Sequence, residues 1–125
     1  MRRFAVIALM ALWCSLFVLD AALPASPAAQ AQDDAETKRQ IRQGKRLFRL
    51  HCQLCHGPEG EHPDPLFSLA DDDWRHGDKL EDIEQNVTEG ILGTAMLGFQ
   101  GRLSEEDIKA VSRYVYTFID EEEGQ

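Results

Sequence analysis

The stretch LHCQLCHG, residues 50–57, places two cysteines and a histidine within five positions. Apart from Cys14, the chain has no other cysteine. The C-x-x-C-H spacing of Cys52, Cys55 and His56 is the pattern to which a haem is covalently attached. Each thiol can join one of the two vinyl groups on one porphyrin edge, and the adjacent histidine can turn under the ring and ligate the iron.

Three other uses of a cysteine pair compete with haem attachment. A disulfide between Cys52 and Cys55 would close a loop too short to add much stability. A zinc ribbon needs four ligands, usually from two such pairs, and only His51, His62 and His76 are available to complete the set. A redox-active dithiol of the thioredoxin type needs a βαβ context, which the sequence does not show. Haem attachment therefore explains the motif best.

The first 31 residues have the layout of a secretory signal peptide. Two arginines precede an apolar run over residues 4–19, and the small residues that end at Ala31 fit a processing site. The run is shorter than the roughly 20 residues that span a bilayer, so a permanent membrane anchor is the less favoured alternative. We therefore expect a signal peptide over residues 1–31, cleaved near Ala31, and export to the periplasm.

The chain is acidic, with a formal net charge of −9 at pH 7. Such a charge repels nucleic acid and anionic lipid and favours a partner with a basic docking surface. The length allows one domain, which we place at residues 32–125, and we expect a monomer. Acidic residues at the end of a helix oppose its dipole, so the tail over residues 121–125 is expected to fray.

A first helix is predicted from Glu36 to about His51, where lysine, arginine, glutamine and leucine predominate. The polar residues 32–36 before it are expected to fray. Glycine weakens a helix interior, so Gly44 indicates that another part of the structure approaches this backbone closely.

Two further helices have recognisable starts. Asp78 and Glu81 form a capping-box pattern, and the apolar stripe that follows them ends near Gly90. Ser104 and Asp107 resemble a second such box at the start of the last helix. No strand pattern is evident, so the sequence predicts an all-α fold of three to four helices. The loops between them are long for a small domain, and a bulky apolar cofactor would fill its thin core.

Met96 is the candidate for a second axial ligand of the iron, opposite His56. It is the one methionine left after removal of the predicted signal peptide, and it lies in the loop GTAMLGF, residues 93–99. Histidine and methionine together raise the reduction potential of haem iron and suit electron transfer. They also leave no open position for oxygen or substrate, which argues against catalysis at the iron. His62 and His76 are alternative ligands.

These motifs together resemble a class I c-type cytochrome over nearly all of residues 32–125. The arrangement G-x-x-x-F-x-x-x-C-x-x-C-H-G begins at Gly44 and Phe48, and Tyr114 occupies the place of an aromatic residue on the last helix. The resemblance implies the cytochrome c fold, in which the first helix crosses the last and helices and loops wrap around one covalently attached haem c. It also implies electron transfer between redox proteins.

The resemblance implies further contacts with the haem. A proline carbonyl would orient His56, with Pro65 as the best match and Pro63 as the alternative. Trp74 would lie near the haem propionates, and Arg75 would help to neutralise them.

We therefore expect a periplasmic electron carrier with one haem, ligated by His56 and Met96. It would accept electrons from a periplasmic dehydrogenase or donate them to a terminal oxidase. The alternative is a haem-based gas sensor or a peroxidase-like enzyme with a displaceable sixth ligand. Many members of the resembled family carry proline after the methionine, whereas Leu97 follows here. We expect the methionine loop to be more mobile as a result.

Overall fold

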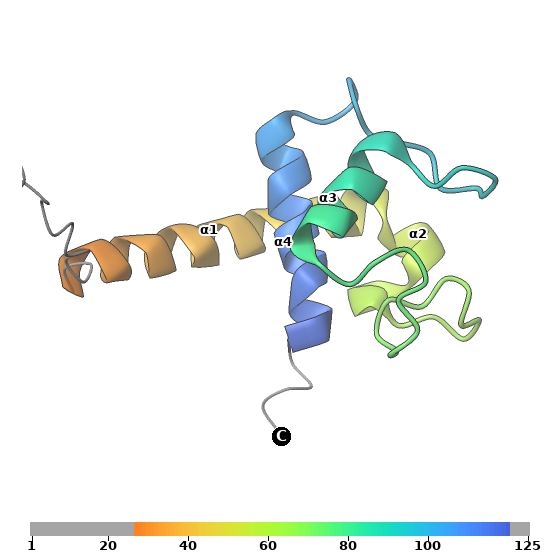
Figure 1. The fold of residues 1–125 in the computed structure, drawn as a ribbon, viewed down its shortest axis with the longest axis horizontal. Coiled ribbons are helices and arrows are strands. Elements are labelled where there is room, and N and C mark those ends of the chain that lie inside the picture. Colours follow the sequence, from red (N-terminus) through yellow and green to blue (C-terminus); the bar gives the residue numbers. More distant parts are fainter. Residues whose placement is uncertain (1–26, 121–125) are drawn as a thin grey trace, which may run out of the picture.

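The computed structural model describes residues 27–120, which form a small helical domain (Figure 1). Its elements are α1 (Pro27–His51), α2 (Gln53–His56), the 3-10 turn η1 (Pro58–Gly60), α3 (Leu80–Glu89) and α4 (Glu105–Asp120). The predicted all-α class is confirmed. No helix within the described range is long and apolar enough to cross a membrane. Most of the predicted signal peptide and the tail over residues 121–125 lie outside the described residues.

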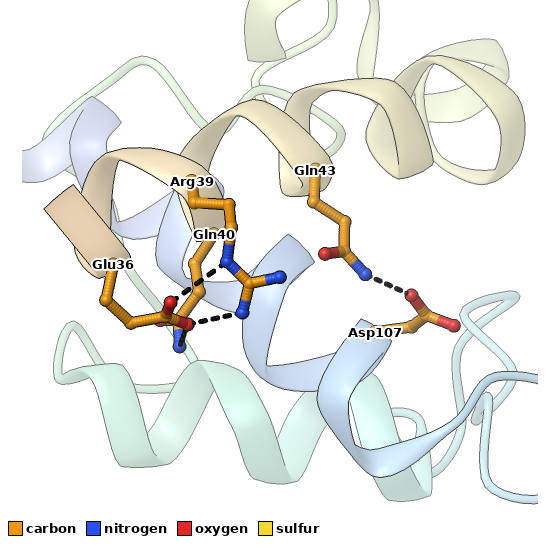
Figure 2. Close-up of polar contacts among 5 residues, drawn as sticks. All are labelled: Glu36, Arg39, Gln40, Gln43 and Asp107. Atoms are coloured by element: carbon orange, nitrogen blue, oxygen red, sulfur yellow. Dashed lines mark hydrogen bonds and ion pairs between the residues drawn. The ribbon is translucent and has the colours of Figure 1, made fainter.

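The first helix is longer than predicted. It begins at Pro27 instead of Glu36, so residues 32–36 are helical and the expected fraying is wrong. Proline is compatible with a first helical turn, where its missing N–H would have no partner within the helix. Glu36 stabilises the next turns by accepting hydrogen bonds from Arg39 Nε at 2.9 Å and from Gln40 Nε2 at 3.0 Å (Figure 2).

α1 crosses α4, and Gly44 lies at the crossing. A Cβ atom at this position would lie 2.0 Å from the carbonyl oxygen of Ala110 and 2.7 Å from the Cβ of Tyr114, which confirms the predicted close approach. One turn later, Phe48 is buried and packs edge to face against Tyr114 and Phe118, with ring centroids 5.5 and 5.8 Å apart. The glycine therefore lets the two helices approach closely enough for these rings to pack.

α3 completes the hydrophobic core against α4. The residues that form this contact are Ile83 and Val87 from α3 and Ile108, Val111 and Val115 from α4, all buried. The core is small, and several partly buried residues of the loops pack against it, among them Trp74 and Met96. The loops therefore belong to the packed structure.

The start of α3 differs from the prediction. Its N-cap residue is Lys79, which makes no side-chain capping bond, so the predicted capping box of Asp78 and Glu81 is wrong. A tertiary contact holds the incoming chain instead, because Asn86 Nδ2 donates a hydrogen bond to the carbonyl oxygen of His76 at 2.9 Å. A side chain from within the helix thus holds the loop before α3.

Ser104 caps the start of α4 as predicted, and the Asp107 carboxylate accepts a hydrogen bond from the Ser104 hydroxyl. Ser104 Oγ accepts a hydrogen bond from the backbone N–H of Asp107 at 3.1 Å and donates one to Asp107 Oδ2 at 2.9 Å. Gln43 of α1 donates to the other carboxylate oxygen, Oδ1, at 2.7 Å (Figure 2). These bonds lower the pKa of Asp107, and the bond from Ser104 is the largest cause.

Substitution Ser104→Ala is expected to lower the free energy of unfolding by about 1 kcal/mol. The pKa of Asp107 is lower in the folded state, so its stabilising effect is complete above the ordinary aspartate value of about 3.9 and is lost as the pH falls through the folded value. The difference between wild type and variant should therefore shrink in that acid window. Urea unfolding at neutral and acid pH measures it, with Ser104→Thr as the control that keeps the hydroxyl. A difference that does not change with pH would show that Ser104 acts independently of the Asp107 charge.

Candidate haem site

Two adjoining cavities lie between the helical core and the loops on either side of α3. Their volumes are about 380 and 310 Å³. Cys52, His56 and Met96 line both of them, and Cys55 lines the smaller one. The structure therefore brings together the four residues that the sequence predicts for haem attachment and ligation, although 40 positions separate His56 from Met96.

The cysteine pair lies where α1 passes into α2. The backbone N–H of Cys52 still bonds to the carbonyl oxygen of Phe48 at 2.8 Å, and those of Cys55 and His56 bond to that of Cys52 at 3.1 and 3.0 Å. Cys52 is half-buried and Cys55 is exposed, and both are free thiols. Burial and the neighbouring Cys55 raise the pKa of Cys52 to about 11. One helical turn thus presents both thiols and the histidine to the cavities.

Gly57 ends α2 and turns the chain away immediately after the histidine. Its φ of 75° lies in the region that favours glycine, and a Cβ atom would lie 1.8 Å from the carbonyl oxygen of Glu61. His56 is therefore the last residue that this helical turn can offer to the cavities.

The carbonyl that orients His56 belongs to Phe67. The distance from His56 Nδ1 to the carbonyl oxygen of Phe67 is 2.8 Å, so the expectation that the carbonyl of Pro65, or of Pro63, accepts this bond is wrong. The reason is a turn at Asp64, whose carbonyl oxygen accepts a hydrogen bond from the backbone N–H of Phe67 at 3.0 Å. This turn directs the chain back toward α2. Pro65 lines the larger cavity instead.

His56 is held in the form that binds a metal ion. Burial lowers its pKa, while the hydrogen bond to the carbonyl of Phe67 acts in the opposite direction. The imidazole is therefore neutral at pH 7, and its Nδ1–H donates to Phe67. The lone pair of Nε2 is then free to ligate iron.

Met96 is positioned by a short, hydrogen-bonded loop after α3. Its backbone N–H donates to Thr94 Oγ1 at 3.1 Å, and its carbonyl oxygen accepts the N–H of Ile91 at 3.0 Å. Gly90 ends α3 as predicted and pairs with Leu97 in an isolated β-bridge. The Met96 side chain is half-buried, whereas that of Leu97 is 71% exposed.

Trp74 and Arg75 both line the larger cavity. Trp74 packs against the hydrophobic core. The guanidinium of Arg75 is paired with Asp73, with 2.7 Å between Nε and Oδ2, and this bond raises the pKa of Arg75. Phe67 and Thr94 also shape the site, and neither was predictable, because a backbone carbonyl and a loop hydroxyl carry no sequence motif.

The sequence matches one known protein family. The family model of cytochrome c oxidase, cbb3-type, subunit III matches residues 39–115. The chain belongs to this cytochrome c family. Cytochrome c domains carry covalently attached haem c, so haem c is the cofactor of this cytochrome.

Several curated proteins are similar to the cytochrome. A cbb3-type cytochrome c oxidase subunit FixP from Azorhizobium caulinodans is 38% identical over 80 residues, and a subunit CcoP from Rubrivivax gelatinosus is 33% identical over 72 residues. Each match covers 58% of this chain but only 27% and 24%, respectively, of the relative. Cytochrome c6 from Synechocystis is 32% identical over 74 residues, which is 58% of this chain and 60% of that protein. No solved structure matches the cytochrome significantly.

The residues around the cavities fit a covalently bound haem. The larger cavity has apolar walls that include Phe48, Val87 and Val111, with a neutral imidazole and a thioether among its lining residues. The two free thiols lie one helical turn apart beside the imidazole. Among residues 27–120, no group of three or more His, Cys, Asp and Glu side chains is arranged to hold a bare metal ion.

Proposed function

We propose that this cytochrome is a periplasmic one-electron carrier, with haem c attached through Cys52 and Cys55 and ligated by His56 and Met96. The observation that carries the proposal is the presence of His56 and Met96 in the walls of both cavities, beside the thiol pair. When bound, haem c supplies reversible one-electron exchange at its iron.

The protein side chains support transfer of electrons in preference to catalysis. His56 is neutral and oriented by the Phe67 carbonyl, and Met96 is held by hydrogen bonds within its loop. With both side chains as ligands, no position on the iron remains for a substrate. The apolar walls exclude water, which limits the reorganisation that accompanies a change of charge. Trp74 and Arg75 are suitably placed in the larger cavity to hold the propionates.

Redox proteins are the partners of such a carrier. The similarity to cbb3 oxidase subunits supports a terminal oxidase as electron acceptor, and a periplasmic dehydrogenase as donor is the other candidate. The periplasmic location is supported by the apolar run over residues 4–19. The smaller cavity is lined by exposed Cys55, Leu66 and Leu97, which supports this region as the surface through which electrons pass. Reduction or oxidation of the purified cytochrome by one candidate partner but not by others would identify that partner.

Substitution Met96→Ala tests the proposed ligand. The variant should lose the weak far-red sulfur-to-iron band of the oxidised protein, its reduction potential should fall, and the reduced form should gain carbon monoxide binding, because one axial position is vacated. Absorption spectra with a redox titration measure these changes. Leu92→Ala is the matched control, because this side chain lies in the same loop, is fully exposed and lines neither cavity, so all three properties should stay unchanged.

The opposite result would favour the gas sensor or peroxidase-like enzyme. A wild-type protein that lacks the far-red band, and a Met96→Ala variant with an unchanged spectrum and potential, would show that Met96 does not ligate the iron. Carbon monoxide binding by the reduced wild type at neutral pH would show that the sixth ligand is displaceable, as the mobile-loop expectation for Leu97 implies.

A further inference from the structure

One helix of this acidic protein is strongly basic. Six of the 13 lysines and arginines fall within residues 38–49, and that segment contains no aspartate or glutamate. The segment belongs to α1, and five of the six side chains are exposed, with Lys45 half-buried. We call these residues the basic face of α1: Lys38, Arg39, Arg42, Lys45, Arg46 and Arg49.

The six cations lie on one side of the helix. At 3.6 residues per turn they fall within an arc of about 120°. This arc points away from Gly44 and Phe48, the residues that pack against α4. The acidic residues near the start of α1, Asp33, Asp34 and Glu36, fall outside the arc. The basic face is therefore turned toward solvent and is not interrupted by negative charge from its own helix.

Most of the charge on this face is not neutralised. Arg39 and Lys45 lie at the two edges of the arc and are paired with Glu36 and Glu59, each at 2.7 Å. The other four cations form no ion pair with any of residues 27–120: Lys38, Arg42, Arg46 and Arg49. The charge of Arg49 also acts on Lys45 and Glu59. Along the centre of the face, the side chains remain available to an external anion.

We propose that the basic face of α1 binds the headgroups of an anionic phospholipid bilayer. Clusters of four to eight basic residues on a helix are suited to such a surface, because each adds favourable interaction with the negative headgroups. The face extends over about 16 Å of straight helix, which matches a flat surface. In Figure 1 the first half of α1 projects beyond the other helices, and the basic face begins at the end of that half with Lys38 and Arg39.

If the signal peptide remains uncleaved, the position of α1 in the chain also brings the helix close to a membrane. The apolar run ends at Leu19 and α1 begins at Pro27, so seven residues separate them. Seven residues reach at most about 25 Å. If the apolar residues 4–19 stay in a bilayer, the start of α1 is therefore held near the headgroups. If they are cleaved off, membrane binding depends on the charges of the basic face alone.

Membrane binding through this face is compatible with electron transfer and with the net charge. None of the six residues lines either cavity, so bound lipid would leave the haem site accessible. The overall charge of −9 opposes the approach to anionic lipid. At physiological salt, however, exposed charges more than about 8 Å apart are largely screened from each other. The positive charge of the basic face then determines whether it binds the anionic headgroups.

Vesicle sedimentation of the exported, haem-loaded protein tests the proposal. Binding is expected to vesicles that contain phosphatidylglycerol, to weaken sharply at high salt, and to be absent with pure phosphatidylcholine. Each cation near the surface strengthens partitioning roughly fivefold. The triple variant Arg42→Glu, Arg46→Glu and Arg49→Glu removes three cations and adds three anions, so it should lose more than about a hundredfold in partitioning. An unchanged haem spectrum shows that this variant is folded.

The matched control carries the same change of charge elsewhere. Its substitutions are Lys79→Glu, Lys109→Glu and Arg113→Glu, none of them on α1. It should retain most of the vesicle binding. An equal loss in both variants, or equal binding of wild type to neutral and anionic vesicles, would overturn the proposal. Failure to bind phosphatidylglycerol vesicles together with salt-sensitive binding to polyglutamate would also overturn it, and would assign the basic face to an acidic protein.

Discussion

A Gly44→Ala variant should lose about 3 kcal/mol or more of its free energy of unfolding, and cells should yield less haem-loaded protein. Alanine is a better helix former than glycine, so the loss must come from packing. The added methyl group would lie 2.0 Å from the carbonyl oxygen of Ala110, a backbone atom that cannot rotate away. α1 and α4 would have to separate, which would expose Phe48 and Tyr114. Urea unfolding followed by circular dichroism and by haem absorption measures the loss.

Gly101→Ala is the control for this substitution. A Cβ atom at Gly101 would meet nothing within 4 Å, and only its φ of 75° is unfavourable for alanine. That strain costs about 1 to 2 kcal/mol, so the control should lose clearly less stability than Gly44→Ala. Equal stability of Gly44→Ala and wild type would contradict a close crossing of the two helices.

Replacing both Cys52 and Cys55 with serine should abolish covalently bound haem. The two free thiols are the proposed attachment points, and serine hydroxyls do not form thioethers. The protein should also be much less stable, because a bound cofactor stabilises the folded state and the apolar cavity walls would otherwise face water. Haem staining after denaturing electrophoresis, together with the intact mass, measures the attachment.

Cys14→Ser is the matched control for the cysteine variant. Cys14 lies in the predicted signal peptide, so its loss should leave the haem content unchanged. Covalent haem in the double serine variant, or its loss in the Cys14→Ser variant, would show that the C-x-x-C-H motif is not the attachment site.

Features encoded by short, local patterns were predictable from the sequence. The close approach at Gly44 and the capping box of Ser104 and Asp107 were both predicted, because one residue type or a fixed spacing specifies each of them. Met96 was recognisable as a ligand candidate because no other methionine follows the predicted signal peptide. In the structure Met96 lines the same two cavities as His56, and its role as a ligand remains a proposal.

Features that depend on tertiary contacts were not predictable. The capping box at Asp78 was wrong because the bond from Asn86 to His76, which fixes the entry to α3, comes from inside the helix. The start of α1 was missed because composition gives only a weak signal for where a helix begins. The basic face is not apparent from the net charge, because the net charge is a sum over the chain, whereas a surface depends on which side of a helix each charge occupies.

The histidine that is proposed to ligate iron is oriented by a main-chain atom. No single substitution can delete the carbonyl oxygen of Phe67, and the turn that presents it is itself closed by a backbone bond to Asp64. The side chain at position 67 can therefore vary over generations while the proximal ligand keeps its strength as a base. Differences in midpoint potential among close variants of this protein should then arise from changes around Met96, the proposed second ligand.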